Sequence, residues 1–304
     1  GGLGIFLGQL SDLLWVLLDM ADLVVKLSDS SLLYDTNNIS YGLVKSGYLS
    51  YVENWRRLML RGVNVDPNIG SSWVERGVPG DDQFGFSIVS PVAPIVFLSG
   101  RGVVTGLKVS GNTWTYLFAG ASASTKYYCF DLMRDDGLPG PYLKTREVSN
   151  VFTFNSNQIP LNVVSSIIAP ERGDRYGRPS TTYLGGRNER ISYQSTSGSA
   201  SVHSLVDINI GSGVEYAAFL PWSRSCGIVD PDTIPGAYTT TYGMAEGAFG
   251  RSGGISFMFA PPGRTTSQDW PPDGTASIGY HSLPVDRRPS ALVIKTGGLP
   301  FPFN

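Results

Sequence analysis

The sequence predicts a mainly β protein: two tandem, related antiparallel β-sandwich-like domains preceded by a short apolar N-terminal helix. First, the stretch 24–46 returns in recognisable form at 144–166, 120 residues further on. Second, the motif Gly-Leu-Pro-x-Pro-aromatic occurs at 137–142 and again at 298–303. Third, the 304 residues include 37 Gly and 20 Pro, whereas only 16% are charged. Such a turn-dense, charge-poor composition is typical of an all-β chain that buries surface against other subunits.

The repeat sets the predicted domain boundaries. Residues 1–22 are assigned to the N-terminal helix, 23–142 to the first β domain and 143–304 to the second. Each copy of the repeat shows a strand, a polar turn, an aromatic strand and a second polar turn, which is the pattern of a β meander. Because the second domain is the longer one, we expect its additional residues to form an inserted polar loop around 170–213.

The N-terminal segment has the pattern of an apolar helix. Leucines recur every three or four residues and would form one stripe on its surface: Leu3, Leu7, Leu10, Leu14 and Leu17. We interpret this stripe as an oligomerisation surface that makes the protein a homo-oligomer. Membrane insertion is the less favoured alternative, since polar residues interrupt a run already shorter than the roughly 20 residues of a membrane span.

Strand-like runs separated by Gly, Pro, Asn and Ser come after the first copy of the repeat. They cover 43–52, 84–89, 95–98, 103–109, 114–118 and 127–133. The sequence Ser110-Gly111-Asn112 between two of these runs predicts a tight hairpin turn. Residues 54–61 fit either a short helix or a strand. In the second domain the strand-like runs cover 214–220, 238–242, 255–260 and 291–295.

The predicted inserted loop is the first candidate for contacts outside its own domain. Its length, its polarity and its many Arg, Ser and Gly residues are typical of a functional or flexible segment. We expect it to contact a neighbouring subunit or a receptor through the side chains of Arg172, Tyr176, Tyr183, Arg187 and Tyr193.

The sequence offers little for catalysis, metals or nucleic acid. His203 and His281 are the only histidines, and neither has ligands at the spacing of a metal site. No common hydrolase, nucleotide or zinc motif occurs, so we predict a non-enzymatic protein without a cofactor. The net charge of −2 gives no electrostatic footprint for nucleic acid. The two cysteines, Cys129 and Cys226, cannot form a disulfide framework, and Cys129 is expected to be a buried thiol.

Two features leave a carbohydrate-related alternative open. Aspartates cluster near the end of the first domain, at Asp131, Asp135 and Asp136, and paired carboxylates can hydrolyse glycosides. Turn chemistry explains such a cluster equally simply. Aromatic residues also lie in or beside polar turns, as on a carbohydrate- or protein-binding face, or as caps of a sandwich: Trp73, Tyr176, Tyr183, Tyr193, Trp222 and Trp270.

The repeated modules resemble those of a known group of proteins. In Leu33-Tyr34-Asp35-Thr36 and Thr153-Phe154-Asn155-Ser156 an aromatic residue leads into Asp or Asn and then Ser or Thr, with a β-branched run after it. This pattern is similar to that of tail-tip and tail-fibre proteins of long-tailed, lambda-like bacteriophages. The tract 114–132 is also similar to the segment that comes after the first module in such proteins. The resemblance covers the first domain and the start of the second.

The resemblance implies a virion protein of the phage tail that has no catalytic residues. It further implies a homo-oligomer, preferably a trimer, that assembles with other tail proteins and contacts a host surface receptor. The alternative is a glycan-binding or glycan-cleaving host-recognition module, which in the cleaving case needs two opposed carboxylates in a concave site.

Overall fold

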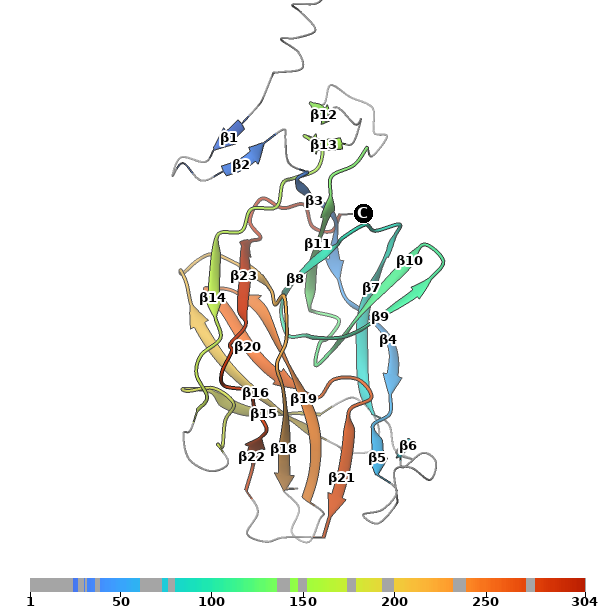
Figure 1. Ribbon diagram of the computed structural model, residues 1–304, viewed down its shortest axis with the longest axis vertical. Helices are drawn as coiled ribbons and strands as arrows, with labels where there is room; N and C mark the ends of the chain where they lie inside the picture. The colour runs from blue at the N-terminus through green and yellow to red at the C-terminus, as the bar shows by residue number, and fades with distance from the viewer. Residues whose placement is uncertain are drawn as a thin grey trace, which may run out of the picture. The chain divides into compact units, whose positions relative to one another are not determined.

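The computed structural model describes residues 24–26, 30, 32–35, 39–60, 73–75, 80–135, 143–146, 152–173, 179–192, 200–231, 239–271 and 277–303. In these residues the regular secondary structure consists of strands, which confirms the mainly β class (Figure 1). The predicted helix at 1–22, with its leucine stripe, lies outside the described residues. Within the described residues, no helix is long and apolar enough to span a membrane.

The chain forms two compact units, and each is assembled from segments that are separated in the sequence. Unit 1 comprises Gly1–Val44, Val92–Pro94 and Phe130–Asn162. Unit 2 comprises Lys45–Pro91, Ile95–Cys129 and Val163–Asn304. These limits differ from the predicted domains 23–142 and 143–304.

Unit 1 contains both copies of the repeat, each as a two-stranded antiparallel hairpin. In the first copy β1 (Val24–Lys26) pairs with β2 (Leu32–Asp35), and in the second β12 (Lys144–Arg146) pairs with β13 (Phe152–Asn155). Val25 lies opposite Tyr34 as Thr145 lies opposite Phe154, and in both hairpins the register shifts one residue later. The two hairpins therefore have the same register at an offset of 120 residues, in agreement with the sequence alignment.

The chain segments after the two hairpins pair with each other. Gly42 lies opposite Pro160 in an antiparallel bridge, with the Leu161 N–H donating to the Tyr41 carbonyl (2.9 Å). On the other side of the bridge the Leu43 N–H donates to the Ile159 carbonyl (2.8 Å). Tyr41 and Leu161 hold the same position in the two copies, so this pairing places equivalent residues opposite each other, as in a symmetric dimer interface.

One sheet of unit 2 has four antiparallel strands in the order β4-β7-β10-β9. They are β4 (Ser50–Trp55), β7 (Asp81–Val89), β10 (Thr113–Ala119) and β9 (Val103–Ser110). Ser110 pairs with Thr113 across the predicted tight turn, where Gly111 has a φ of 55°. Positive φ is what such two-residue turns require, and glycine adopts it without strain.

A second, larger sheet crosses unit 2 with β19 near its centre (Figure 1). Its main path is β14 (Ser165–Ile168), β23 (Ser290–Lys295), β17 (Tyr216–Phe219), β8 (Ile95–Ser99), β19 (Thr239–Arg251), β20 (Gly254–Ala260), β16 (Ala200–Asn209) and β15 (Arg187–Ser192). Further strands join it: β18 (Ser225–Pro231), β22 (Gly279–His281), β21 (Thr266–Trp270), β5 (Leu58–Leu60) and β6 (Trp73–Glu75). The remaining two, β3 (Tyr41–Tyr48) and β11 (Lys126–Leu132), pair with each other, and β11 also pairs with β8 of the main path.

The core of unit 2 lies on the inner face of this large sheet. Aromatic and aliphatic side chains fill it, including the fully buried Tyr183, Ile228, Phe257, Phe259 and Tyr280. Burying each such side chain is worth about 1.5–3 kcal/mol relative to exposure. The core therefore fixes which face of each of these strands remains free for a site.

The second half of the chain differs from the expected arrangement in two respects. The polar stretch 170–213 contains β15 and β16, and β16 lies between β15 and β20 in the sheet. The strand β16 is buried although its composition is polar, because its polar groups have hydrogen-bond partners inside the protein. The Ser204 hydroxyl, for example, accepts hydrogen bonds from the Thr182 N–H and hydroxyl (3.0 and 2.9 Å). In addition, β8 from the predicted first domain pairs with β17 and β19 of the predicted second, so these strands share one sheet.

Candidate functional site: an uncharged groove on the outer sheet face

A groove of about 220 Å³ opens on the outer face of unit 2, over strands β18, β19, β21 and β22. These strands are neighbours in the sheet, and β5 and β6 extend the series beyond β21 (Figure 1). The groove is lined by Trp73, Gly227, Thr241, Tyr242, Gly243, Thr266, Ser267, Gln268 and His281. Five segments distant in the sequence thus contribute to one surface.

Two paired glycines form the floor of the groove. Gly227 of β18 lies opposite Gly243 of β19 on one side and opposite His281 of β22 on the other. A Cβ atom at Gly227 would lie 2.1 Å from His281 Cε1, so only glycine lets this ring lie over the strand. The His281 imidazole therefore covers Gly227, and the Thr265 hydroxyl lies 2.8 Å from where a Cβ atom of Gly243 would be, so small or planar groups replace larger side chains at this floor.

Polar and aromatic side chains stand beside this floor. Thr241 of β19 lies opposite Gln268 of β21, which places their side chains on the same face. Trp73 of β6 is 41% exposed although it is a large aromatic residue. Trp270, also 41% exposed, borders the groove, since its indole N–H donates to Thr241 Oγ1 (3.3 Å). The groove therefore offers aromatic surface beside an amide and hydroxyls.

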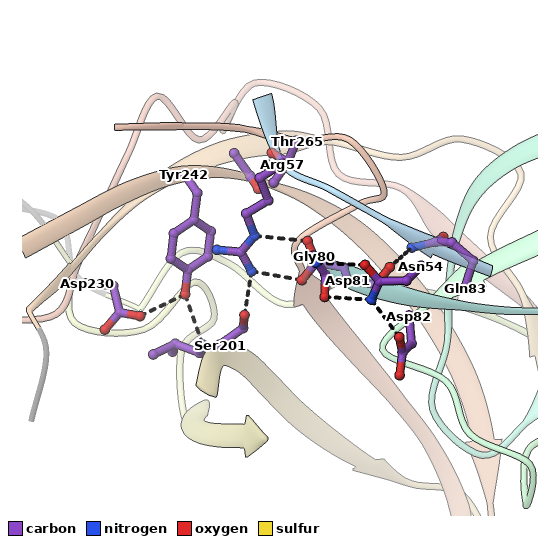
Figure 2. A network of polar contacts seen from close by, with 12 residues as sticks. Asn54, Arg57, Gly80, Asp81, Asp82, Gln83, Ser201, Asp230, Tyr242 and Thr265 are labelled. Carbon is purple, nitrogen blue, oxygen red and sulfur yellow. Dashed lines mark hydrogen bonds and ion pairs between the residues drawn. The ribbon is translucent and has the colours of Figure 1, made fainter. Parts of the chain in front are cut away.

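The strand that carries the floor is fixed from the inner side by Tyr242, as Figure 2 shows. The Tyr242 hydroxyl donates to Asp230 Oδ2 (2.9 Å) and accepts from the Val202 N–H (2.9 Å). Arg57 lies against the ring, with its guanidinium carbon 4.4 Å from the ring centroid. Burial, and after it the charge of Asp230, raises the pKa of Tyr242 well above its usual value, so the hydroxyl stays protonated as a donor.

Arg57 links this tyrosine to the small sheet. It donates two hydrogen bonds to the carboxylate of Asp81 (2.9 and 2.8 Å) and one to the Ser201 hydroxyl (Figure 2). The Asp81 side chain is 1% exposed and that of Arg57 12% exposed. Such a two-pronged, buried contact holds both groups in one geometry. The network joins β7 and the β4–β5 connection to the inner side of the groove strand β19.

The groove carries no carboxylate, ammonium or guanidinium group among the described residues that line it. The nearest acidic residue of the network, Asp230, faces the inner side and is bonded to Arg190 (2.6 Å). Burial is the main cause that raises the pKa of Asp230, and Arg190 opposes it. Apart from the imidazole of His281, the described lining of the groove thus consists of neutral side chains.

A second buried polar cluster lies in the core. The Arg224 guanidinium donates two hydrogen bonds to Glu246 (both 2.7 Å), and the Tyr183 hydroxyl donates a third (2.8 Å). The side chains of Arg224 and Glu246 are 2% and 0% exposed. Because both charges are paired and hydrogen-bonded, this cluster has the features of a structural contact.

Among the residues predicted as a contact loop, the structure describes Arg172, Tyr183 and Arg187, and these three differ in exposure. Tyr183 is fully buried in the core, so its side chain is not available for an outside contact. Arg172 is half-buried, whereas Arg187 is exposed and bonded to Glu189 and Asp207. Tyr176 and Tyr193 lie outside the described residues, as do the stripe residues Leu3, Leu7, Leu10, Leu14 and Leu17.

The structure also places the groups considered for chemistry. Asp131 is completely buried and accepts hydrogen bonds from the N–H groups of Val92, Ala93 and Leu132, which fixes a turn. Cys129 is buried, as predicted, and Cys226 is buried too, where burial raises its pKa to about 12. The described residues contain no group of three or more His, Cys, Asp or Glu that could hold a metal ion.

Sequence patterns indicated part of the groove and missed the rest. Trp73 and Trp270 stand out in the sequence as aromatics in polar surroundings. Gly227, Gly243 and Gln268 were missed, although glycines inside strand-like runs are a signal for close approach of a ligand or another side chain. Strand pairing was needed to show that the two glycines are neighbours.

Comparison of the chain with models of protein families, with characterised proteins and with solved structures found no match.

Proposed function

We propose that this protein is a non-enzymatic structural protein of a bacteriophage tail, at the tail tip or the base of a tail fibre. In this role it assembles with other tail subunits in the virion and contacts the host surface. The observation that carries the proposal is the pair of repeated modules on which the resemblance rests. Both fold as hairpins with the same register and the same irregularity, and the segments after them pair with each other.

Exposed apolar surface on the small sheet supports assembly. Val109 and Leu107 of β9 are 58% and 43% exposed, and they lie opposite Trp114 and Tyr116 of β10. These four residues share one face, because strand residues two apart point to the same side. Contiguous apolar patches on a protein surface commonly mark contacts with other proteins.

A native mass measurement on the purified chain tests whether the protein forms an oligomer. The expected result is a homo-oligomer, with a trimer preferred. Mass spectrometry of purified phage tails, from a host that carries the coding sequence, tests whether the protein is part of the tail. The chain should appear among the tail proteins. A stable monomer at micromolar concentration, or tails that lack the chain, would contradict the proposal.

The groove favours a second candidate function, that of a glycan-binding host-recognition module. Exposed aromatic rings beside amide and hydroxyl groups are suited to stacking on a sugar ring and bonding its hydroxyls. Glycoside cleavage uses a pair of carboxylates, whereas the described lining offers aromatic and hydrogen-bonding groups, which suit binding.

A further inference from the structure

We propose that the groove over Gly227 and Gly243 is a binding site for a neutral saccharide, with one sugar ring stacked on Trp73. The amide of Gln268, the hydroxyl of Thr241 and the imidazole of His281 then supply hydrogen bonds to the sugar hydroxyls. This inference rests on the second candidate function, because it names the chemical class of the ligand and the residues that recognise it.

The shape of the groove favours a flat, ring-sized ligand. Its volume of about 220 Å³ is below the roughly 300–1,000 Å³ of pockets that enclose drug-sized molecules, so a ligand stays partly in solvent. The floor consists of Gly243 and of the His281 imidazole, which lies over the paired Gly227, so no long side chain stands on it. A saccharide ring that lies on this floor reaches side chains on both sides of it.

The chemistry of the walls favours a ligand with many hydroxyl groups. The Gln268 amide and the Thr266 hydroxyl can each donate and accept hydrogen bonds. The Thr241 hydroxyl already donates to the Gln268 backbone carbonyl and accepts from the Trp270 indole (both 3.3 Å), so it can offer a ligand one further lone pair. Trp73 presents an apolar face, which suits the C–H groups of a sugar ring. Hydrogen-bonding groups beside an aromatic ring match a polyhydroxylated sugar ring better than they match an apolar peptide side chain.

The charges of the described residues at the groove favour a neutral saccharide. No described lining residue carries an ammonium or guanidinium group that would pair with a sugar carboxylate or sulfate. The basic residue Arg264 faces Glu75 of β6 at 3.8 Å, so the nearby charges offset each other. The described lining thus offers hydrogen bonds and an aromatic ring, which suit a neutral saccharide.

The groove is held in shape before any ligand binds. Tyr242 is bonded on the inner side to Asp230 and Val202, and Arg57 lies on its ring (Figure 2). The His281 ring lies against Gly227, where any larger residue would displace the ring from this position. Preorganisation of this kind lowers the entropic cost of binding.

The experiment uses the full-length chain and a panel of soluble polysaccharides: neutral dextran, mannan, galactan and β-glucan, and acidic alginate and polysialic acid. Binding is measured by affinity gel electrophoresis and by titration of intrinsic tryptophan fluorescence. Trp73→Ala and Gln268→Ala are the groove variants. Trp222→Ala is the matched control, since Trp222 is 45% exposed and does not line the groove.

We expect at least one neutral polysaccharide to bind, and Trp73→Ala to weaken that binding by about tenfold or more. Gln268→Ala should weaken it less, and Trp222→Ala should leave it unchanged. Unchanged thermal unfolding of the variants shows that the loss arises in the groove. The inference is overturned if no neutral polysaccharide binds, if only acidic ones bind, or if Trp222→Ala has the same effect as Trp73→Ala.

The outcome is separable from that of the proposed tail function. A chain that is found in tails but binds no neutral polysaccharide retains the tail function and loses this site. A chain that binds through Trp73 but is absent from tails retains the site as a glycan-binding module outside a virion.

Discussion

Arg57 shows how a single residue connects distant parts of unit 2. It lies in the short connection between β4 and β5, yet it contacts Asp81 of β7, Ser201 of β16 and the ring of Tyr242 on β19. A buried guanidinium is unfavourable unless it is paired, and here each contact satisfies part of its charge or its donors. The arginine therefore makes the position of the groove strand depend on the small sheet.

Replacement of Arg57 by Ala should lower the free energy of unfolding by about 3–5 kcal/mol, because it leaves the buried carboxylate of Asp81 without its partner. Urea denaturation measures this change. Lys108→Ala is the control: Lys108 pairs with Glu53 on the surface, and its side chain is 49% exposed. Its removal should cost no more than about 1 kcal/mol. Equal effects of the two variants would show that the Arg57 network does not stabilise the fold.

His203 makes the free energy of unfolding depend on pH, and its burial sets the direction of this dependence. Burial lowers the pKa of His203 from 6.5 to about 3, and the charges of Arg101 and Arg57 act in the same direction. Below pH 6.5 the unfolded chain therefore binds a proton that the folded chain binds only near pH 3. The stability contributed by neutral His203 is complete above pH 6.5 and is lost as the pH falls toward 3.

We expect His203→Gln to flatten the fall in unfolding free energy between pH 6.5 and 4, relative to the unchanged chain. The difference in slope should approach about 1.4 kcal/mol per pH unit. Urea denaturation at several pH values measures the slopes, and NMR monitors the imidazole directly. An imidazole signal that titrates with a midpoint near 6.5 in the folded protein would contradict the argument.

At the scale of elements, the repeated hairpin is the most informative feature of unit 1. Each copy is too small to be stable alone, since an isolated two-stranded hairpin is at best marginal in water. The segments after the two hairpins pair across Gly42 and Pro160, so each copy supports the other. This explains why the copies occur within one unit and do not each begin a separate domain.

Gly42→Ala tests the pairing of the two copies. A Cβ atom at this position would lie 2.7 Å from Gln158 Cβ and 3.0 Å from Met133 Cγ, so the packed strands must move apart. We expect a loss of about 1–3 kcal/mol, with hydrogen exchange of the Leu43 and Leu161 amides accelerated. In contrast, Gly297→Ala meets no atom within 4 Å and should change stability by no more than about 1 kcal/mol. Slow exchange of both amides in Gly42→Ala would contradict this account.

At the scale of the whole molecule, two apolar surfaces are candidates for contacts with other subunits. One is the face of β9 and β10 that carries Leu107 and Val109. The other is the leucine stripe at the N-terminus, which remains a prediction from the sequence. Both surfaces are expected in a protein that assembles, which adds support to the tail function proposed from the repeated modules.

The double substitution Leu10→Asp and Leu14→Asp tests the role of the stripe. Because charged residues cannot be buried without partners, the variant should dissociate the assembly while the β units stay folded. Native mass and circular dichroism measure these two properties. A variant that keeps the native mass would show that the N-terminal segment does not hold the oligomer together, and membrane insertion would become the better interpretation.

The sequence by itself determined the class and the local structures of this protein. Alternating apolar runs, Gly- and Pro-rich turns and the turn at Ser110-Gly111-Asn112 act over a few residues, and the structure agrees with them. The 120-residue repeat also predicted two equivalent hairpins, since register depends on local pattern and turn chemistry. Trp73 and Trp270 could be singled out because large aromatics in polar surroundings are unusual.

Only the tertiary structure decided which distant strands are neighbours, and with it the division into units and the groove. The stretch 200–209 looks polar, but much of it is buried, since a hydroxyl such as that of Ser204 finds its partner at Thr182. In the sequence Tyr183 looks like an aromatic residue of a loop. In the structure it lies in the core, where its hydroxyl donates a hydrogen bond to Glu246, 63 positions away. Gly227 and Gly243 form a floor only because β18 pairs with β19. Such pairings depend on long-range packing, which no local pattern encodes.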